Sequence, residues 1–310
     1  MTIPSRVTET SMTSKVLSDL QRSLQRGQKL QSQISSGKLL NRPSDSPTGT
    51  VTALQLRTEA RATQQYARNA DDGLGWLGTI QDTLGDASTS MLRIRDLTVQ
   101  ALNATNDATS RGALANEIDN IRDTLFGQAN STFLGRPVFG GTTTGSTAFQ
   151  MDPVTKQVTY VGQPQPPANP DPVTRTVGPN AKVRVETSGA EAFGKKGGDP
   201  ARLFNLLNTL SADIRAGDDN AINADLANLD DAHETLKAAL SDVGARYNRV
   251  EQMKQSAADH MLSVSSQLSD VEDVDLPKAI MDLQIQQTSY QAALAAASKV
   301  IQPSLIDFLR

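Results

Sequence analysis

The fold of this chain is decided by residues 226–271, LANLDDAHETLKAALSDVGARYNRVEQMKQSAADHMLSVSSQLSDV. Apolar residues recur there in alternating steps of three and four, interrupted only by His233 and Lys254. A repeat of this length predicts one long helix with a coiled-coil-like seam. The seam positions are Leu226, Leu229, His233, Leu236, Leu240, Val243, Tyr247, Val250, Lys254, Ala257, Met261, Val264, Leu268 and Val271.

A second seam follows the first and belongs to a separate helix. Between them lies Asp270–Pro277, and Pro277 is tolerated only in the first turn of a helix. Asp275 is well placed as the N-cap of this second helix. The second seam comprises Ile280, Leu283, Gln287, Tyr290, Leu294, Ala297 and Ile301.

The N-terminal third repeats this organisation. The spacing predicts a first helix that Gly37 ends as a C-cap, and a next helix with Ser46 as N-cap and Pro47 in its first turn. Apolar positions from Leu56 to Ala101 extend that helix, and a shorter one is expected over about 110–130. The first seam here comprises Leu17, Leu20, Leu24, Gly27, Gln31 and Ile34.

The middle of the chain differs in composition and period. Between about residues 135 and 198 Gly and Pro cluster, and Val158, Tyr160 and Lys182–Glu186 alternate as strands do. Residues 152–156 and 178–180 are typical of turns. We therefore expect a small β insertion within a helical protein.

These patterns together predict a mainly α protein. Long coiled-coil-like helices from both termini pack together, and the β-rich domain lies at the far end. The expected parts are an inner helical core from residues 1–45 and 272–310, and a helical rod domain from 46–134 and 199–271. The β-rich inserted domain is expected over 135–198.

Composition excludes several classes of function. The chain has no cysteine, so disulfides, Cys-type zinc sites and thiol nucleophiles are excluded. Its net charge is −4, which disfavours nucleic-acid binding. Residues 1–13 do not resemble a Sec signal peptide, and no apolar run reaches the about 18 residues of a membrane span.

Three features with possible chemistry are better explained structurally. Gly73–Gly78 matches the dinucleotide pattern G-x-G-x-x-G, but no strand precedes it, so close helix packing with Trp76 as an anchor is favoured. His233 and His260 have no ligand-spaced partner. The acidic residues from Asp270 to Asp275 lack the pattern of a calcium loop and suit helix capping. We expect no catalytic residue, metal or cofactor.

Several segments resemble the flagellin superfamily. They are Gln33–Lys38, Asn41–Pro47, Leu92–Ala101, Ala115–Ile121 and Gln128–Arg136. Within that superfamily, Val271–Ile280, Gln286–Tyr290, Pro303–Leu309 and Pro137–Thr142 are most similar to the hook-associated protein 3 family.

This resemblance implies a structural role and no enzymatic activity. A closed, symmetric ring of about eleven copies would join the flagellar hook to the filament. Its partners would be further copies of the chain, hook-associated protein 1, flagellin and an export chaperone, with no nucleic acid and no membrane insertion. The protein would be extracellular, secreted through the flagellar type III apparatus.

The resemblance also implies which residues form the assembly interface. The two outer seams have few large side chains, so their helices are expected to order against neighbouring subunits. The expected interface residues are Leu17, Leu20, Leu24, Ile34, Ile280, Leu283, Tyr290, Leu294, Ile301, Leu305 and Phe308.

Two alternatives remain open. The first is a flagellin-type filament subunit, which belongs to the same structural class. The second is an enzyme with its site in the β insertion, which excision of residues 137–197 would test.

Overall fold

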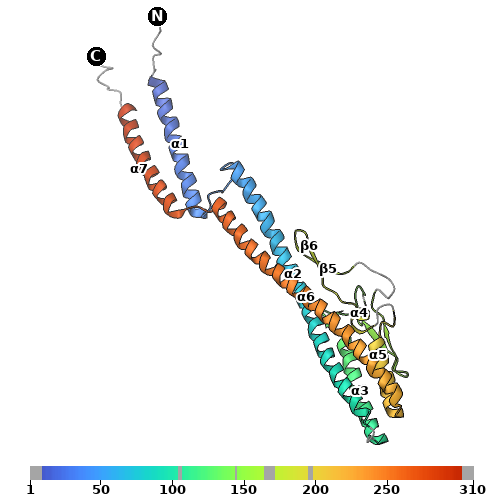
Figure 1. Ribbon diagram of the computed structural model, residues 1–310. Helices are drawn as coiled ribbons and strands as arrows, with labels where there is room; N and C mark the ends of the chain where they lie inside the picture. The colour runs from blue at the N-terminus through green and yellow to red at the C-terminus, as the bar shows by residue number, and fades with distance from the viewer. Residues whose placement is uncertain (1–8, 104–106, 144, 164–171, 195–197, 302–310) are drawn as a thin grey trace, which may run out of the picture. The chain divides into compact units, whose positions relative to one another are not determined.

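The computed structural model describes residues 9–103, 107–143, 145–163, 172–194 and 198–301, with side chains from residue 14 to residue 298 of these ranges. The chain divides into two compact units, which are described separately. Unit 1 comprises Met1–Ala62 and Met261–Arg310, and unit 2 comprises Thr63–His260. The mainly α class, with a small β insertion, is confirmed (Figure 1).

Long helices make up most of the described chain. In order they are α1 (Glu9–Ser36), α2 (Pro47–Ala101), α3 (Ala108–Ala129), α4 (Gly189–Phe193), α5 (Arg202–Ala216), α6 (Asp219–Glu272) and α7 (Leu276–Ile301). The seam at 226–271 correctly predicted α6 but not its earlier start. The short helix α4, which a Ser188 capping box begins, was not predicted.

Local signals determine where the long helices begin and end. Gly37 has φ +69, the left-handed conformation that ends α1 at little cost. The Ser46 hydroxyl accepts from the Gly49 backbone N–H at 3.1 Å and so caps α2. The Asp275 carboxylate accepts from the Lys278 N–H at 3.1 Å and caps α7. All three predicted caps are confirmed.

Three antiparallel hairpins form the β insertion in unit 2. They are β1 (Thr132–Phe133) with β2 (Arg136–Pro137), β3 (Phe149–Met151) with β4 (Val158–Tyr160), and β5 (Thr174–Gly178) with β6 (Ala181–Arg184). Phe133 pairs with Arg136, Gln150 with Thr159, and Arg175 with Val183. The predicted turn at 152–156 is present, where the Asp152 carboxylate accepts from the backbone of Val154 and Thr155.

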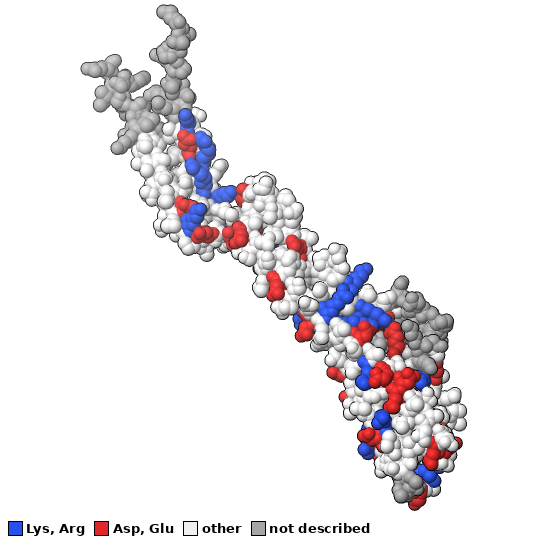
Figure 2. Space-filling model, viewed as in Figure 1, with Lys and Arg blue, Asp and Glu red and all other residues white. Residues whose placement is uncertain are grey.

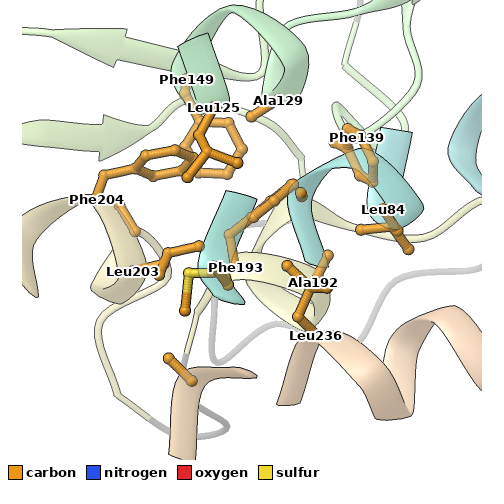
Figure 3. Close-up of a cluster of buried hydrophobic side chains, with 14 of the residues drawn as sticks. Leu84, Leu125, Ala129, Phe139, Phe149, Ala192, Phe193, Leu203, Phe204 and Leu236 are labelled. Atoms are coloured by element: carbon orange, nitrogen blue, oxygen red, sulfur yellow. The ribbon is translucent and has the colours of Figure 1, made fainter. Parts of the chain in front are cut away.

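The core of unit 2 is built from the predicted helix seams and a cluster of phenylalanines (Figure 3). On α2 the seam residues Leu77, Ile80, Leu84, Met91 and Ile94 are all fully buried. The chain's few aromatic residues concentrate here. Contacts between rings whose centroids lie 5.1–6.2 Å apart join β3 and the segment after β2 to α3, α4 and α5. This phenylalanine network comprises Phe126, Phe139, Phe149, Phe193 and Phe204.

The glycine pattern at 73–78 lies inside α2 and serves packing, as predicted. A side chain at Gly75 would come within 2.7 Å of the Phe133 ring. Trp76 beside it is buried and meets Phe133 edge-on. The backbone N–H groups of these glycines belong to the helix, so this segment is no phosphate-binding loop.

A buried carboxyl group makes the stability of unit 2 depend on pH. Asp225 of α6 is buried beside Asp213 of α5, and among the described residues its Oδ2 has no hydrogen-bond partner. Burial, with the Asp213 carboxylate, raises the pKa of Asp225 to about 6. Between about pH 4 and 6 the folded chain therefore binds more protons than the unfolded chain, and stability falls as pH rises.

Asp225→Asn should raise the free energy of unfolding at pH 7.5 by about 2 kcal/mol, because the amide needs no proton to be neutral. The gain should shrink as pH falls from 6 to 4. Urea unfolding at a series of pH values measures it, with the exposed Asp82→Asn as matched control. Equal stability of the Asp225→Asn variant and the wild type at pH 7.5 would contradict this account.

Candidate assembly interface

Helices α1 and α7 lie side by side and run antiparallel within unit 1 (Figure 1). The direction follows from two contacts, because Ser23 meets Gln286 while Gly37 meets Val274. On α1 the facing stripe consists of Val16, Leu20, Ser23, Gly27, Leu30 and Ile34. On α7 it consists of Ala279, Leu283, Gln286, Tyr290 and Ala297.

A polar contact joins the two helices midway along this stripe. The Gln286 side-chain amide donates to the Ser23 carbonyl oxygen at 3.0 Å and to its hydroxyl at 2.6 Å. Gly27 lies beside the stem of Gln286, where a side chain would be at contact distance. A single polar pair within an apolar helix seam selects one register, because any slip leaves buried polar groups without partners.

The α1–α7 contact buries little apolar surface. Ser23 and Gln33 are the buried residues of α1 among the described side chains, and Ala279 and Ala297 those of α7. The larger side chains Leu20, Leu283 and Tyr290 are only half-buried. A fully buried leucine contributes about 1.5–3 kcal/mol, so these contacts give much less than the same residues would in a core.

Large apolar side chains also point away from the pair. Leu17 and Leu24 of α1 are 56% and 48% exposed, and Ile280 and Leu294 of α7 are 45% and 43% exposed. Met281 and Ile285 of α7 are more exposed still. Apart from Lys278, Asp282 and Lys299, α7 has no charged residue, and its visible face in Figure 2 is largely uncharged.

The predicted interface residues therefore fall into three groups. Leu20, Ile34, Leu283 and Tyr290 lie half-buried on the facing stripes, whereas Leu17, Leu24, Ile280 and Leu294 are exposed. The Ile301 side chain, Leu305 and Phe308 lie outside the described residues. The face of α1 that meets α7 runs through Val16, Ser23 and Leu30, one position before the seam that we expected.

A short backbone clasp ties the two linkers that lead into this pair. The Leu39 N–H donates to the Glu272 carbonyl at 2.6 Å, and the Val274 N–H donates to the Gly37 carbonyl at 3.1 Å. Lys38 and Asp273 thereby form an antiparallel bridge. These hydrogen bonds join the segment that follows α1 to the segment that follows α6. Lys38 and Asp273, which face each other there, are 235 positions apart in the sequence.

Charged side chains reinforce the clasp. Glu272 is buried and accepts from Arg57 of α2 at 2.7 and 2.8 Å, the two-bond geometry of a strong ion pair. The Lys38 ammonium is 2.5 Å from Asp273 and 3.7 Å from Glu272. The hydrogen bond between Lys38 and Asp273 raises the pKa of Lys38. The same bond, together with a hydrogen bond from Ser269, lowers the pKa of Asp273. Helix capping, the expected role of this acidic run, holds only for Asp275.

The described residues contain no cluster of three His, Cys, Asp or Glu side chains that could hold a metal. His233 forms a 3.0 Å hydrogen bond with Ser88 between α6 and α2. No helix in the described ranges is long and apolar enough to cross a membrane.

Two family descriptions match the helical parts of the chain. Residues 7–144 match the bacterial flagellin N-terminal helical region, and residues 226–309 match the bacterial flagellin C-terminal helical region. Together they take in α1, α2, α3, α6 and α7, which include both helices of the terminal pair.

Two relatives that match over most of their length agree with these family descriptions. The chain is 27% identical to flagellin of Bacillus subtilis strain 168 over 300 residues, 91% of this chain and 92% of the relative. It is 27% identical to flagellar hook-associated protein 3 of Escherichia coli K12 over 280 residues, 85% and 87% of the two chains.

A solved structure has the same fold. It is a putative flagellar hook-associated protein from Vibrio parahaemolyticus, with a TM-score of 0.64 and 21% identity. The match covers 74% of this chain and all of that one. The matches to the flagellin helical regions, to flagellin and to hook-associated protein 3 place the chain among the structural subunits of the bacterial flagellum. The chain belongs to the flagellin family.

We predict that Glu272→Ala opens the clasp, because Arg57 and Lys38 lose a shared partner. Amide hydrogen exchange at Leu39 and Val274 should quicken about tenfold, the effect of losing about 1.4 kcal/mol. Exchange in the phenylalanine core should stay the same. Asp270→Ala, which removes an exposed carboxylate two residues away, is the matched control. Exchange at both amides as slow as in the wild type would rule out a stabilising role for Glu272.

Proposed function

We propose that this chain is the junction protein between the flagellar hook and the flagellin filament. The single observation that carries the assembly role is the apolar surface which both terminal helices leave uncovered. The resemblance to hook-associated protein 3 supports the junction in particular. The likeness to hook-associated protein 3 of Escherichia coli extends over 85% of this chain and 87% of the relative. The segments Val271–Ile280 and Gln286–Tyr290 resemble that family in sequence.

In this proposal the terminal pair is completed by other copies. Leu17 and Leu24 on α1, and Ile280 and Leu294 on α7, pack against neighbouring subunits. The half-buried Leu20, Ile34, Leu283 and Tyr290 become fully covered at the same time. The pair thereby gains the apolar burial that it lacks alone.

The assembly would be a ring of about eleven copies. Head-to-tail contacts form a closed ring when the rotation from one copy to the next divides a full turn evenly. The ring would sit on hook-associated protein 1, and flagellin would polymerise on it. Export through the type III apparatus, with a chaperone on the apolar C-terminal helix, delivers the chain to the cell exterior. Residues 1–45 and 272–310 form the inner core of that ring, 46–134 and 199–271 its rod layer, and 135–198 its inserted domain. Neither a catalytic role nor a cofactor is part of this proposal.

The variant Leu294→Asp should abolish incorporation into flagella, because it places a charge in a surface that assembly desolvates. Leu283→Asp should do the same. Neither should change the thermal midpoint of unit 2. Gln284→Asp, at an exposed polar position of α7, is the control and should incorporate normally. Immunoblots of sheared flagella measure incorporation, and wild-type amounts of the Leu294→Asp variant would refute the proposed interface.

A null strain tests the junction role directly. Electron microscopy should show hooks without filaments, with flagellin released into the medium. Antibody labelling of the complemented strain should mark one short zone at the end of the hook. Normal filaments in the null strain would contradict the junction role.

One observation favours a second candidate, a flagellin-type filament subunit. Flagellin of Bacillus subtilis is 27% identical to this chain over 300 residues, the same identity as hook-associated protein 3 of Escherichia coli shows over 280 residues. A filament subunit would be labelled by antibody along the whole filament and would be the main protein of sheared filaments. The same labelling experiment therefore separates the two functions.

A further inference from the structure

The last hairpin of the β insertion, β5–β6, is bound to the long helix α2 within unit 2. The Asn69 side-chain amide of α2 donates to the Thr176 carbonyl oxygen at 2.8 Å. The Arg175 guanidinium of β5 lies 2.6 Å from the Asp72 carboxylate, which is also on α2. The hairpin and the two residues after it, 174–186, are here called the β5–β6 segment.

The end of the β5–β6 segment is bound to the other long helix, α6. The Arg246 side chain of α6 donates to the Glu186 carbonyl oxygen at 2.7 Å. Val185, the residue before Glu186, is fully buried. A Cβ atom at Gly73 of α2 would lie 3.3 Å from the Val185 side chain and 3.7 Å from that of Val250 on α6. The two helices and the β5–β6 segment therefore meet at this glycine, whose missing side chain lets them approach closely.

The contact between α2 and α6 is thinly packed next to this meeting point. The helices run antiparallel, since Asp71 pairs with Lys254 while Ser88, further along α2, pairs with His233. Lys254 holds a seam position but is about half exposed, and an exposed ion pair contributes little stability. Small side chains bury little apolar surface, so the seam holds this stretch weakly. The α2 residues that precede Gly73 at seam spacing are all small: Thr63, Ala67 and Ala70.

The β5–β6 segment adds apolar burial where the seam lacks it. Val177, Val183 and Val185 are all buried and belong to the core of unit 2. We infer that the β insertion acts as a strap, in which residues 174–186 fasten α2 to α6 where their own seam is thinly packed. The strap is anchored on α2 by Asn69 and Asp72 and on α6 by Arg246. This gives the insertion a role within one copy, beyond the proposed function of the assembled chain.

Releasing the strap from one helix should loosen the other helix. In the full-length chain, Asn69→Ala with Asp72→Ala removes both anchors on α2. Amide hydrogen exchange at Val250 and Lys254, on the opposite helix, should quicken about tenfold. Alanine favours a helix more than Asn or Asp does, so a weaker α2 could not be the cause. Gln65→Ala, which removes side-chain hydrogen bonds made within α2, is the matched control.

Releasing the strap from α6 gives the reciprocal test. Arg246→Ala should quicken exchange at the Ala67 and Ala70 amides of α2 about tenfold. Asp242→Ala is the matched control, because it removes the partner of Arg246 within α6 and leaves the contact with Glu186. Either release opens the same strap, so the combined variant should also show an effect of about tenfold. Two independent contributions would instead multiply to about a hundredfold.

Three results would overturn the strap. Unchanged exchange on the opposite helix would mean that the helices carry the β5–β6 segment and are not fastened by it. A hundredfold effect in the combined variant would mean that the two anchors act separately. An equal increase at Leu84, in the buried seam of α2, would mean that the segment stabilises unit 2 as a whole. The proposed function would stand in each case, because exchange is measured on the soluble chain.

Discussion

The interaction on which the account depends is the lightly packed pair of terminal helices, α1 and α7. Among the described side chains, the buried ones of α1 and α7 are Ser23, Gln33, Ala279 and Ala297, and a polar pair, Ser23 with Gln286, joins the two helices. Such an interface defines register more than it provides stability. The larger side chains of both helices are half-buried or point outward, so their burial requires another molecule.

The clasp and the core of unit 2 show where stability within one copy comes from. Glu272, Arg57 and Lys38 tie the two linkers together, so both ends of the chain enter the pair from fixed points. In unit 2 the fully buried seam of α2 and the phenylalanine network supply the apolar burial that the terminal pair lacks. Apolar burial within one copy is therefore concentrated in unit 2 and is sparse in the terminal pair.

Sequence periodicity and caps predicted the helices because both are local properties. Gly37, Ser46 and Asp275 each act within one turn, and the seam repeats over most of α6, from Leu226 to Val271. The face of α1 was harder to predict, because Leu17 and Leu24 are one position from Val16 and Ser23 and both stripes have helical spacing. The Arg57–Glu272 pair joins residues 215 positions apart, which no local pattern reveals. The two-residue turn of Leu134 and Gly135 between β1 and β2 was not predicted, because Leu-Gly is not a usual turn dipeptide.

The central claim is that α1 and α7 reach full stability only when other copies cover them. Limited proteolysis of the soluble chain, compared with the chain in isolated flagella, tests this most directly. Cleavage should remove residues before about 45 and after about 272 from the soluble chain, leave unit 2 intact, and stop once the chain is assembled. If both ends of the soluble chain resisted protease as well as unit 2 does, the terminal pair would be stable without partners and the claim would be wrong.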